Sequence, residues 1–123
     1  MARILVIDDD PVLRAMIEQT LNSVGHEVVL AADGREGVAQ YRTRPADVVI
    51  TDIYMPNQGG LETIIELRQR FPKVPIIALS GTAAARTMLS IAQKFGAVAV
   101  LQKPFVIDEL LSAVGKALDI KAN

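Results

Sequence analysis

The sequence contains no cysteine and no tryptophan, and only 4% of its 123 residues are aromatic. Without cysteine the chain can form neither disulfides nor thiolate metal sites, and such a composition favours a cytoplasmic protein. The single histidine, His26, follows a glycine and lies far along the chain from the aspartates at residues 8–10 and 52, which argues against zinc or copper there. Since half of the residues are hydrophobic, we expect an aliphatic core.

Long hydrophobic runs and a strong net charge are also missing. No apolar run approaches the ~20 residues of a membrane-spanning helix. The run Ile4-Leu5-Val6-Ile7 is too short for a signal peptide and ends in three aspartates. A formal net charge of -1 gives no electrostatic reason for binding to nucleic acid or to a membrane surface, and we expect neither. The length fits one domain, residues 1–123, without linkers or repeats.

Short apolar runs alternate with amphipathic segments along the whole chain. The runs predict buried strands at residues 4–7, 27–31, 47–51, 74–79 and 98–101. The helical stripes predict helices at residues 11–24, 36–42, 61–70, 83–95 and 107–118. This (βα)5 pattern predicts an α/β fold, a parallel five-stranded sheet covered on both faces. Of the two common doubly wound orders, the flavodoxin-like three-layer order 2-1-3-4-5 fits five strands better.

Polar residues follow four of the predicted strands. In the order 2-1-3-4-5 the carboxyl ends of strands 1 and 3 are neighbours, and ligands bind beside them. Three carboxylates there repel one another unless a hard cation such as Mg²⁺ binds them. With a hydroxyl and a lysine, the cluster suits a phosphoryl group, and the carboxylate at the end of the central strand can form an aspartyl phosphate. These residues are Asp8 and Asp9, Asp52, Ser80 and Lys103.

Simpler interpretations exist for several of these residues. Asp10, directly before Pro11, fits the N-cap of the first helix. Ser80 fits the cap of the helix that follows it equally well. Lys103, before Pro104, would be interpreted as an ordinary surface lysine if it stood alone. The carboxylates and the hydroxyl at the other strand ends favour a role in the site.

The residues resemble the receiver domain of bacterial two-component response regulators over essentially the whole chain. Each matching motif is weak alone, but their order and spacing are specific. The motifs are Asp8-Asp9, then Thr51-Asp52 with Met55-Pro56 and Gly60, then Leu79-Ser80-Gly81, then Lys103-Pro104-Phe105.

The resemblance implies that Asp52 accepts a phosphoryl group from a phosphohistidine on a sensor histidine kinase or a histidine phosphotransfer protein. Asp9, Asp52 and the backbone carbonyl of Tyr54 would ligate Mg²⁺, and Asp8 would act largely through water. Such a domain is a signalling domain rather than an enzyme, because it catalyses only its own phosphorylation and dephosphorylation.

The resemblance also assigns the residues around the phosphoryl group. Ser80, the Gly81 amide and Lys103 would bind its oxygens, and the bond from Lys103 to Pro104 would be cis. Ser80 would shift toward the phosphoryl group and repack the surface formed by residues 83–118. This surface would work as a two-state switch, with Val100 as a second switch position.

Some positions modify the family pattern. Many receivers have an aromatic residue where this chain has Val100, so a readout by a swinging ring is not expected. Tyr54, two residues after Asp52, is bulky, and we expect it to slow autodephosphorylation by shielding the phosphoryl group from water. Thr82 has the same spacing from Ser80. Arg14 and Glu18, placed on the outer side of the first helix, form a hypothetical kinase-facing surface.

Other interpretations stay open. The chain ends soon after its last predicted helix, and we favour a stand-alone receiver acting on an unknown downstream protein over a piece of a longer regulator. Dimerisation on phosphorylation also stays open. The alternatives in function are a haloacid-dehalogenase-type phosphatase, with Asp8 as nucleophile and Asp10 as acid/base, and a scaffold receiver that needs no phosphorylation.

Overall fold

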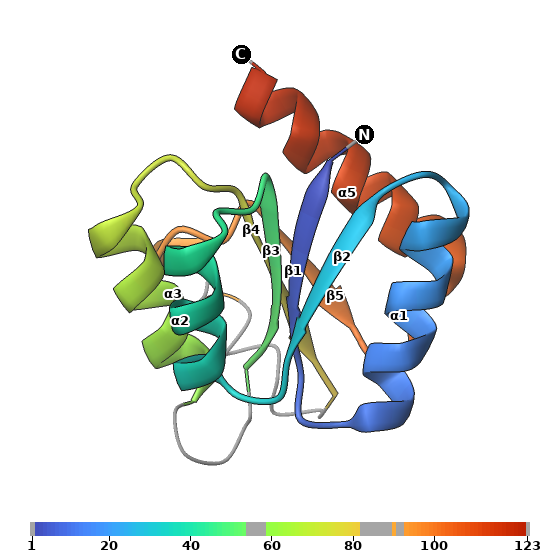
Figure 1. Cartoon of the computed structure of the whole chain (residues 1–123), viewed down its shortest axis with the longest axis horizontal. Coiled ribbons are helices and arrows are strands. Elements are labelled where there is room, and N and C mark those ends of the chain that lie inside the picture. The colour runs from blue at the N-terminus through green and yellow to red at the C-terminus, as the bar shows by residue number, and fades with distance from the viewer. Residues whose placement is uncertain (1, 54–58, 82–89, 91–92, 123) are drawn as a thin grey trace.

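A computed structural model of the chain describes residues 2–53, 59–81, 90 and 93–122 (Figure 1). Within these ranges the elements, in chain order, are β1 (Arg3–Ile7), α1 (Pro11–Ser23), β2 (Glu27–Ala31), α2 (Gly34–Thr43), β3 (Val48–Asp52), α3 (Gly60–Arg70), β4 (Ile76–Ser80), β5 (Ala99–Gln102) and α5 (Ile107–Ala122). The helix predicted over residues 83–95 lies largely outside the described residues.

All strands are parallel and form one sheet in the order β2-β1-β3-β4-β5. Helices α2 and α3 cover one face of the sheet, and α1 and α5 cover the other (Figure 1). The predicted doubly wound three-layer fold is therefore confirmed. None of the helices in the described part of the chain combines the length and the apolar character needed to cross a bilayer.

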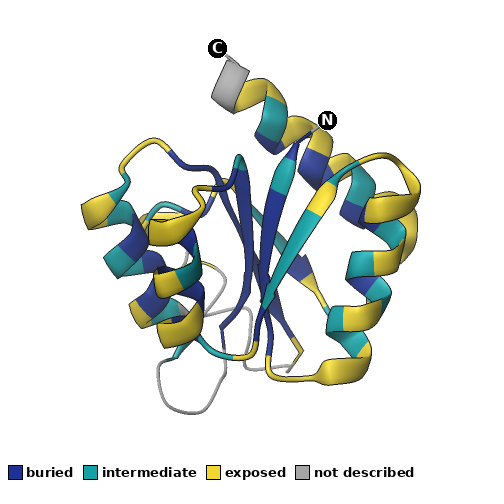
Figure 2. Cartoon of the chain, viewed as in Figure 1, coloured by how far each residue is buried: buried dark blue, intermediate teal, exposed yellow. Residues whose placement is uncertain are grey.

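The strands in the middle of the sheet are buried (Figure 2). Their alternating side chains supply two hydrophobic cores, one on each face of the sheet. On the α2–α3 side, Leu5 and Val49 pack with Leu67. On the α1–α5 side, Ile4 and Ile50 pack with Leu21, Leu110 and other aliphatic residues. The central strands β3 and β4 are buried along their whole length, which explains why their sequences are continuous apolar runs.

Helix α2 begins earlier than predicted. The sequence Asp33-Gly34 indicates only a turn, but the Asp33 side chain accepts a hydrogen bond from the Glu36 amide at 2.8 Å and caps the helix. Glu36 accepts in turn from the amide of Ala32 at 3.2 Å. The two bonds resemble a capping box in which Glu36 reaches the amide of Ala32 instead of that of the N-cap residue Asp33, and they stabilise a helix whose glycines weaken it.

The apolar stripes of two helices are exposed at their first turns. Val12 is 77% exposed and Ile107 is 53% exposed, although both are apolar residues of amphipathic helices. The physical reason is position, because both helices begin beyond the carboxyl ends of the strands, where the sheet no longer covers them. Phe95, the last residue of the helix predicted over residues 83–95, is also exposed, at 46%. Gly25 and Gly96, which directly follow the predicted helices 11–24 and 83–95, have φ of 94° and 111°, as is typical of residues that end helices.

Candidate functional site

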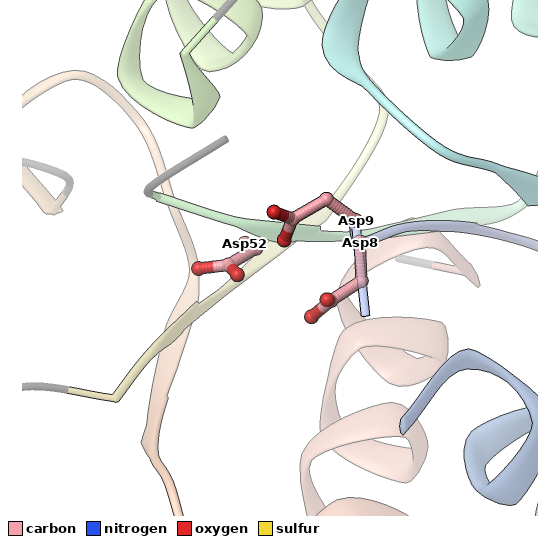
Figure 3. Close-up of side chains that lie close together, drawn as sticks. All are labelled: Asp8, Asp9 and Asp52. Atoms are coloured by element: carbon pink, nitrogen blue, oxygen red, sulfur yellow. The ribbon is translucent and has the colours of Figure 1, made fainter. Parts of the chain in front are cut away.

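The pairing of β1 with β3 brings two carboxylates together at the carboxyl edge of the sheet. Ile7 pairs with Thr51, so the residues that follow them, Asp8 and Asp52, emerge side by side. Both are buried, with Asp8 at 0% and Asp52 at 6% exposed. With Asp9 they offer one carboxylate oxygen each, all within 4.8 Å of one another (Figure 3). The predicted acidic cluster is therefore present.

Lys103 is the cation of this cluster. Its ammonium group donates to Asp52 Oδ2 at 2.9 Å and to Asp8 Oδ2 at 3.0 Å. Two contacts hold the lysine in place: its amide donates to the Ser80 carbonyl at 2.6 Å, and its side chain packs on Gly81, where a Cβ atom would lie 3.3 Å from Lys103 Cδ. The peptide bond from Lys103 to Pro104 is cis.

The electrostatics of the cluster follow from this burial. The pKa of Asp8 is raised, mainly because burial disfavours the charged carboxylate, and the nearby Asp52 adds to the rise. Hydrogen bonds from the Asp10 amide and Lys103 offset only part of it. Burial lowers the pKa of Lys103, but its bonds to Asp52 and Asp8 and their negative charges outweigh burial, so this pKa is raised. The lysine is therefore firmly charged.

Asp10 has a structural role at the start of α1. Its side chain accepts from the amides of Val12 at 2.9 Å and Leu13 at 3.4 Å, which confirms the predicted N-cap. Its own amide donates to Asp8 Oδ1 at 2.8 Å and so orients that carboxylate. A carboxylate engaged with helix amides is poorly placed as an acid/base, which argues against the phosphatase alternative.

Arg14 belongs to the site, a position that its sequence did not indicate. The sequence places it on the outer face of the first helix, but it is half-buried and its Nη1 donates to the backbone carbonyl of Asp8 at 2.7 Å. A long side chain that reaches back to a carbonyl six residues earlier leaves no signal in hydrophobic periodicity.

The remaining predicted residues lie near the cluster or outside the described residues. Ser80, the last residue of β4, is fully buried, and its hydroxyl has no hydrogen-bond partner in the described part of the chain. The structure therefore does not bring the hydroxyl into contact with the carboxylates. Val100 lies on β5 opposite Ala78 and is partly buried. Tyr54 and Thr82 fall outside the described residues.

The donor set fits a hard divalent cation. Three carboxylates offer only oxygen atoms, which is the ligand type that Mg²⁺ and Ca²⁺ select, whereas zinc and copper prefer nitrogen or sulfur. Two of the carboxylates are buried, so positive charge beside them is favourable. The acidic cluster could thus hold a metal ion, together with a lysine that already neutralises part of its charge.

Fold and site together define a doubly wound α/β domain with a carboxylate–lysine cluster where its strand order reverses. Residues 4–115 match the model of the response regulator receiver domain family. A receiver domain from Clostridium thermocellum superposes with a TM-score of 0.93 at 32% identity, over 99% of this chain and 98% of that one. The chemotaxis protein CheY4 of Vibrio cholerae gives a TM-score of 0.88 at 34% identity, over 96% and 99% of the two chains.

Curated relatives give the same family. The chain is 36% identical over 120 residues to the C4-dicarboxylate transport transcriptional regulatory protein DctD of Pseudomonas aeruginosa, covering 97% of this chain and 26% of that protein. It is 35% identical to the DNA-binding transcriptional regulator NtrC of Azospirillum brasilense, over 96% of this chain and 24% of that protein. The chain belongs to the response regulator receiver domain family and is a receiver domain of a two-component system.

These relatives correct the prediction about partners. From its net charge we expected no binding to nucleic acid, and from its interpretation as a stand-alone receiver we expected action on a downstream protein, but NtrC is a DNA-binding transcriptional regulator. The charge of -1 describes only these 123 residues. Since the chain spans about a quarter of the length of DctD and NtrC, its charge cannot report what a longer regulator binds.

Proposed function

We propose that this receiver accepts a phosphoryl group on Asp52 from the phosphohistidine of a sensor histidine kinase, in a reaction that requires Mg²⁺. The observation that supports the proposal most is the position of Lys103, whose ammonium group contacts both Asp52 and Asp8. A fixed cation at this place would neutralise the oxygens of a phosphoryl group that arrives at Asp52.

In the proposed transfer, a carboxylate oxygen of Asp52 forms a bond to phosphorus while the bond from phosphorus to the donor imidazole nitrogen breaks. The nitrogen keeps the electron pair and takes a proton from solvent. In the return step water attacks phosphorus, inorganic phosphate leaves, and the Asp52 carboxylate is restored. The domain would therefore catalyse only its own phosphorylation and dephosphorylation.

Asp8, Asp9 and Asp52 would hold the Mg²⁺, with the carbonyl of Tyr54 as a further proposed ligand. When bound, the ion would offset the negative charge of the phosphoryl oxygens. The proposal is supported by the oxygen-only donor set and by the burial of two of its members.

Ser80 and Gly81 are proposed to hydrogen-bond the phosphoryl oxygens. A buried hydroxyl without a partner is costly, and a phosphoryl oxygen would give it one. By strand alternation Ser80 shares the α2–α3 side with Ile76 and Ala78, so it must shift to reach the phosphoryl group. Since the Lys103 amide is bonded to the Ser80 carbonyl, this shift would reach β5 and α5, with Val100 moving as an aliphatic packing residue.

The test is intact-protein mass spectrometry after incubation with acetyl phosphate and Mg²⁺, followed by peptide mapping. The wild type should gain one phosphoryl group on Asp52, and Asp52→Asn should gain none. Asp10→Asn is the matched control, because it changes a neighbouring acid but keeps a capping residue, and it should be labelled like the wild type. A wild type without label would support a scaffold receiver, and label on Asp8 would support the phosphatase chemistry.

A further inference from the structure

We infer that Arg14 is a positioning residue for the carboxylate of Asp9, because its guanidinium group holds the peptide unit that joins Asp8 to Asp9. The inference rests on the proposed function, since its consequence is a higher affinity of the acidic cluster for Mg²⁺. It assigns the helix α1 a direct part in building the site.

The contact that carries this inference is made to a backbone atom. Arg14 Nη1 lies 2.7 Å from the carbonyl oxygen of Asp8, a charge-assisted hydrogen bond. That oxygen belongs to the planar unit that includes the amide of Asp9. Holding the oxygen therefore restricts ψ of Asp8 and φ of Asp9, and these two angles set the direction in which the Cβ atom of Asp9 leaves the backbone, from which its rotamer then places the carboxylate.

Asp9 depends on this restraint more than its neighbours do. The Asp8 carboxylate is fixed by Lys103 and by the Asp10 amide, and Asp52 is part of β3. Asp9 is exposed, and within the described residues its side chain makes no hydrogen bond or ion pair. Its carboxylate nevertheless lies with those of Asp8 and Asp52 (Figure 3). The backbone of the loop must therefore set its direction.

The restraint has a firm base on the helix. The Arg14 amide donates to the Asp10 carbonyl at 3.0 Å, so the first turn of α1 is regular, and the Asp10 side chain caps it. The arginine side chain is half-buried as it returns to Asp8. The Asp10 cap, the first turn of α1 and the bond from Arg14 to Asp8 thus connect residues 8–14 by hydrogen bonds at both ends.

Two roles for Arg14 predict opposite effects. If Arg14 acted only through its positive charge, its removal would strengthen cation binding by removing a repulsion. If it positions Asp9, its removal weakens cation binding in spite of that gain. Loss of an outer residue that orients a metal ligand typically costs 10–100-fold in affinity, and for an effect through the backbone we expect about tenfold.

The experiment compares Mg²⁺ dissociation constants of the wild type, Arg14→Met and Arg14→Lys by calorimetric titration, under conditions where urea curves show each to be fully folded. Arg42→Met is the matched control, because it removes an exposed arginine of α2 far from the cluster. We expect about tenfold weaker binding for Arg14→Met, a smaller loss for Arg14→Lys, and no change for Arg42→Met. Equal or tighter binding by Arg14→Met overturns the inference.

A second readout uses the metal-free protein. In ¹⁵N NMR spectra, Arg14→Met should shift the amide resonance of Asp9 and increase its mobility, while the amide of Asp52 stays in place. An unchanged Asp9 amide would overturn the inference even if affinity fell. A wild type that binds no Mg²⁺ would instead overturn the proposed function, and the Asp9 resonance would still decide the role of Arg14.

Discussion

The ammonium group of Lys103 and the carboxylate of Asp52 are 2.9 Å apart, an ion pair between the last residue of β3 and the first residue beyond β5. The same lysine contacts Asp8 at 3.0 Å, so one cation serves two buried carboxylates. This arrangement has consequences for stability as well as for chemistry.

Lys103→Met should destabilise the metal-free protein. Without the cation, Asp8 and Asp52 repel each other at low exposure, and the unfolding free energy at neutral pH should fall by about 3 kcal/mol. The raised pKa of Lys103 means that its contribution is complete below the ordinary value of 10.5 and is lost only as pH rises through the raised pKa. Urea unfolding with circular dichroism measures the change.

The control is Lys116→Met, which removes an exposed lysine of α5 and should change stability little. In acid the loss in Lys103→Met should shrink, because Asp8, whose pKa is raised, takes up a proton before an ordinary carboxylate does. An equal loss at both pH values would contradict this explanation.

Asp8→Asn should stabilise the metal-free protein at neutral pH. The pKa of Asp8 is raised above 3.8, so the folded state favours its protonated form. The stability that the protonated Asp8 contributes is fully present below pH 3.8 and is lost as pH rises through its raised pKa. Asparagine never ionises, so the variant does not lose it. The advantage of the variant should therefore be absent in acid and grow with pH, as measured by urea curves at several pH values.

Mg²⁺ should reverse the order of stability of the wild type and Asp8→Asn. Binding to the folded state stabilises the wild type by mass action, and the variant lacks one carboxylate of the cluster. Asp10→Asn, which keeps the cap, serves as control and should follow the wild type. If Mg²⁺ stabilised Asp8→Asn as much as the wild type, Asp8 would have no part in the metal site.

Ser80→Ala should not destabilise the protein, although the hydroxyl is completely buried. Because that hydroxyl has no partner among the residues that the structure describes, its removal relieves a desolvation cost of about 1–3 kcal/mol, against a small loss of packing. Thr63→Val is the contrasting control, since the Thr63 hydroxyl is buried and donates to the Gly59 carbonyl at 3.0 Å, and its loss should cost about 1 kcal/mol. Thermal unfolding of both variants checks the opposite signs.

Gly37→Ala should disturb the packing of α2 on the sheet and so lower the free energy of unfolding. A Cβ at Gly37 would overlap the Cδ1 atom of Ile7, and such overpacking costs about 1–3 kcal/mol. Gly115→Ala in α5 is the control, because nothing lies within 4 Å of its added Cβ, and helix propensity alone should then stabilise the protein by about 1 kcal/mol.

A double variant identifies the clash. Ile7→Val removes the Cδ1 atom and alone costs about 1 kcal/mol. Combined with Gly37→Ala, it should cost less than the sum of the two single changes, because the atom nearest to the added Cβ is then absent and only the γ carbon, 2.7 Å away, still crowds it. Additive losses in urea unfolding would show that the close approach of α2 and β1 is not the cause.

Much of the fold and of the site was predictable, because their signals are local. Buried parallel strands must be continuous apolar runs, and such runs end at Asp8, Asp52, Ser80 and Lys103. The doubly wound order then places these ends at one edge without any knowledge of loops. In the structure Lys103 contacts both carboxylates, whereas the Ser80 hydroxyl makes no hydrogen bond to them or to any other described residue.

The features that were not predicted mostly depend on how far side chains and helices extend in the folded structure. The bond from Arg14 to the Asp8 carbonyl involves a flexible side chain and a backbone atom, neither of which periodicity describes. The exposure of Val12 depends on how far α1 extends past the sheet. The earlier start of α2 did have a signal, since Asp33 and Glu36 have the spacing of a capping box.

The pairing of Ile7 with Thr51 has a consequence for folding experiments. Strand side chains alternate between the two faces, so a slip of β3 by one residue would turn Asp52 from the α1–α5 side to the α2–α3 side, away from Asp8. Any cation affinity that needs both carboxylates is therefore a property of the correctly registered sheet. In a refolding reaction, the recovery of that affinity would report the moment at which β1 and β3 reach their native alignment.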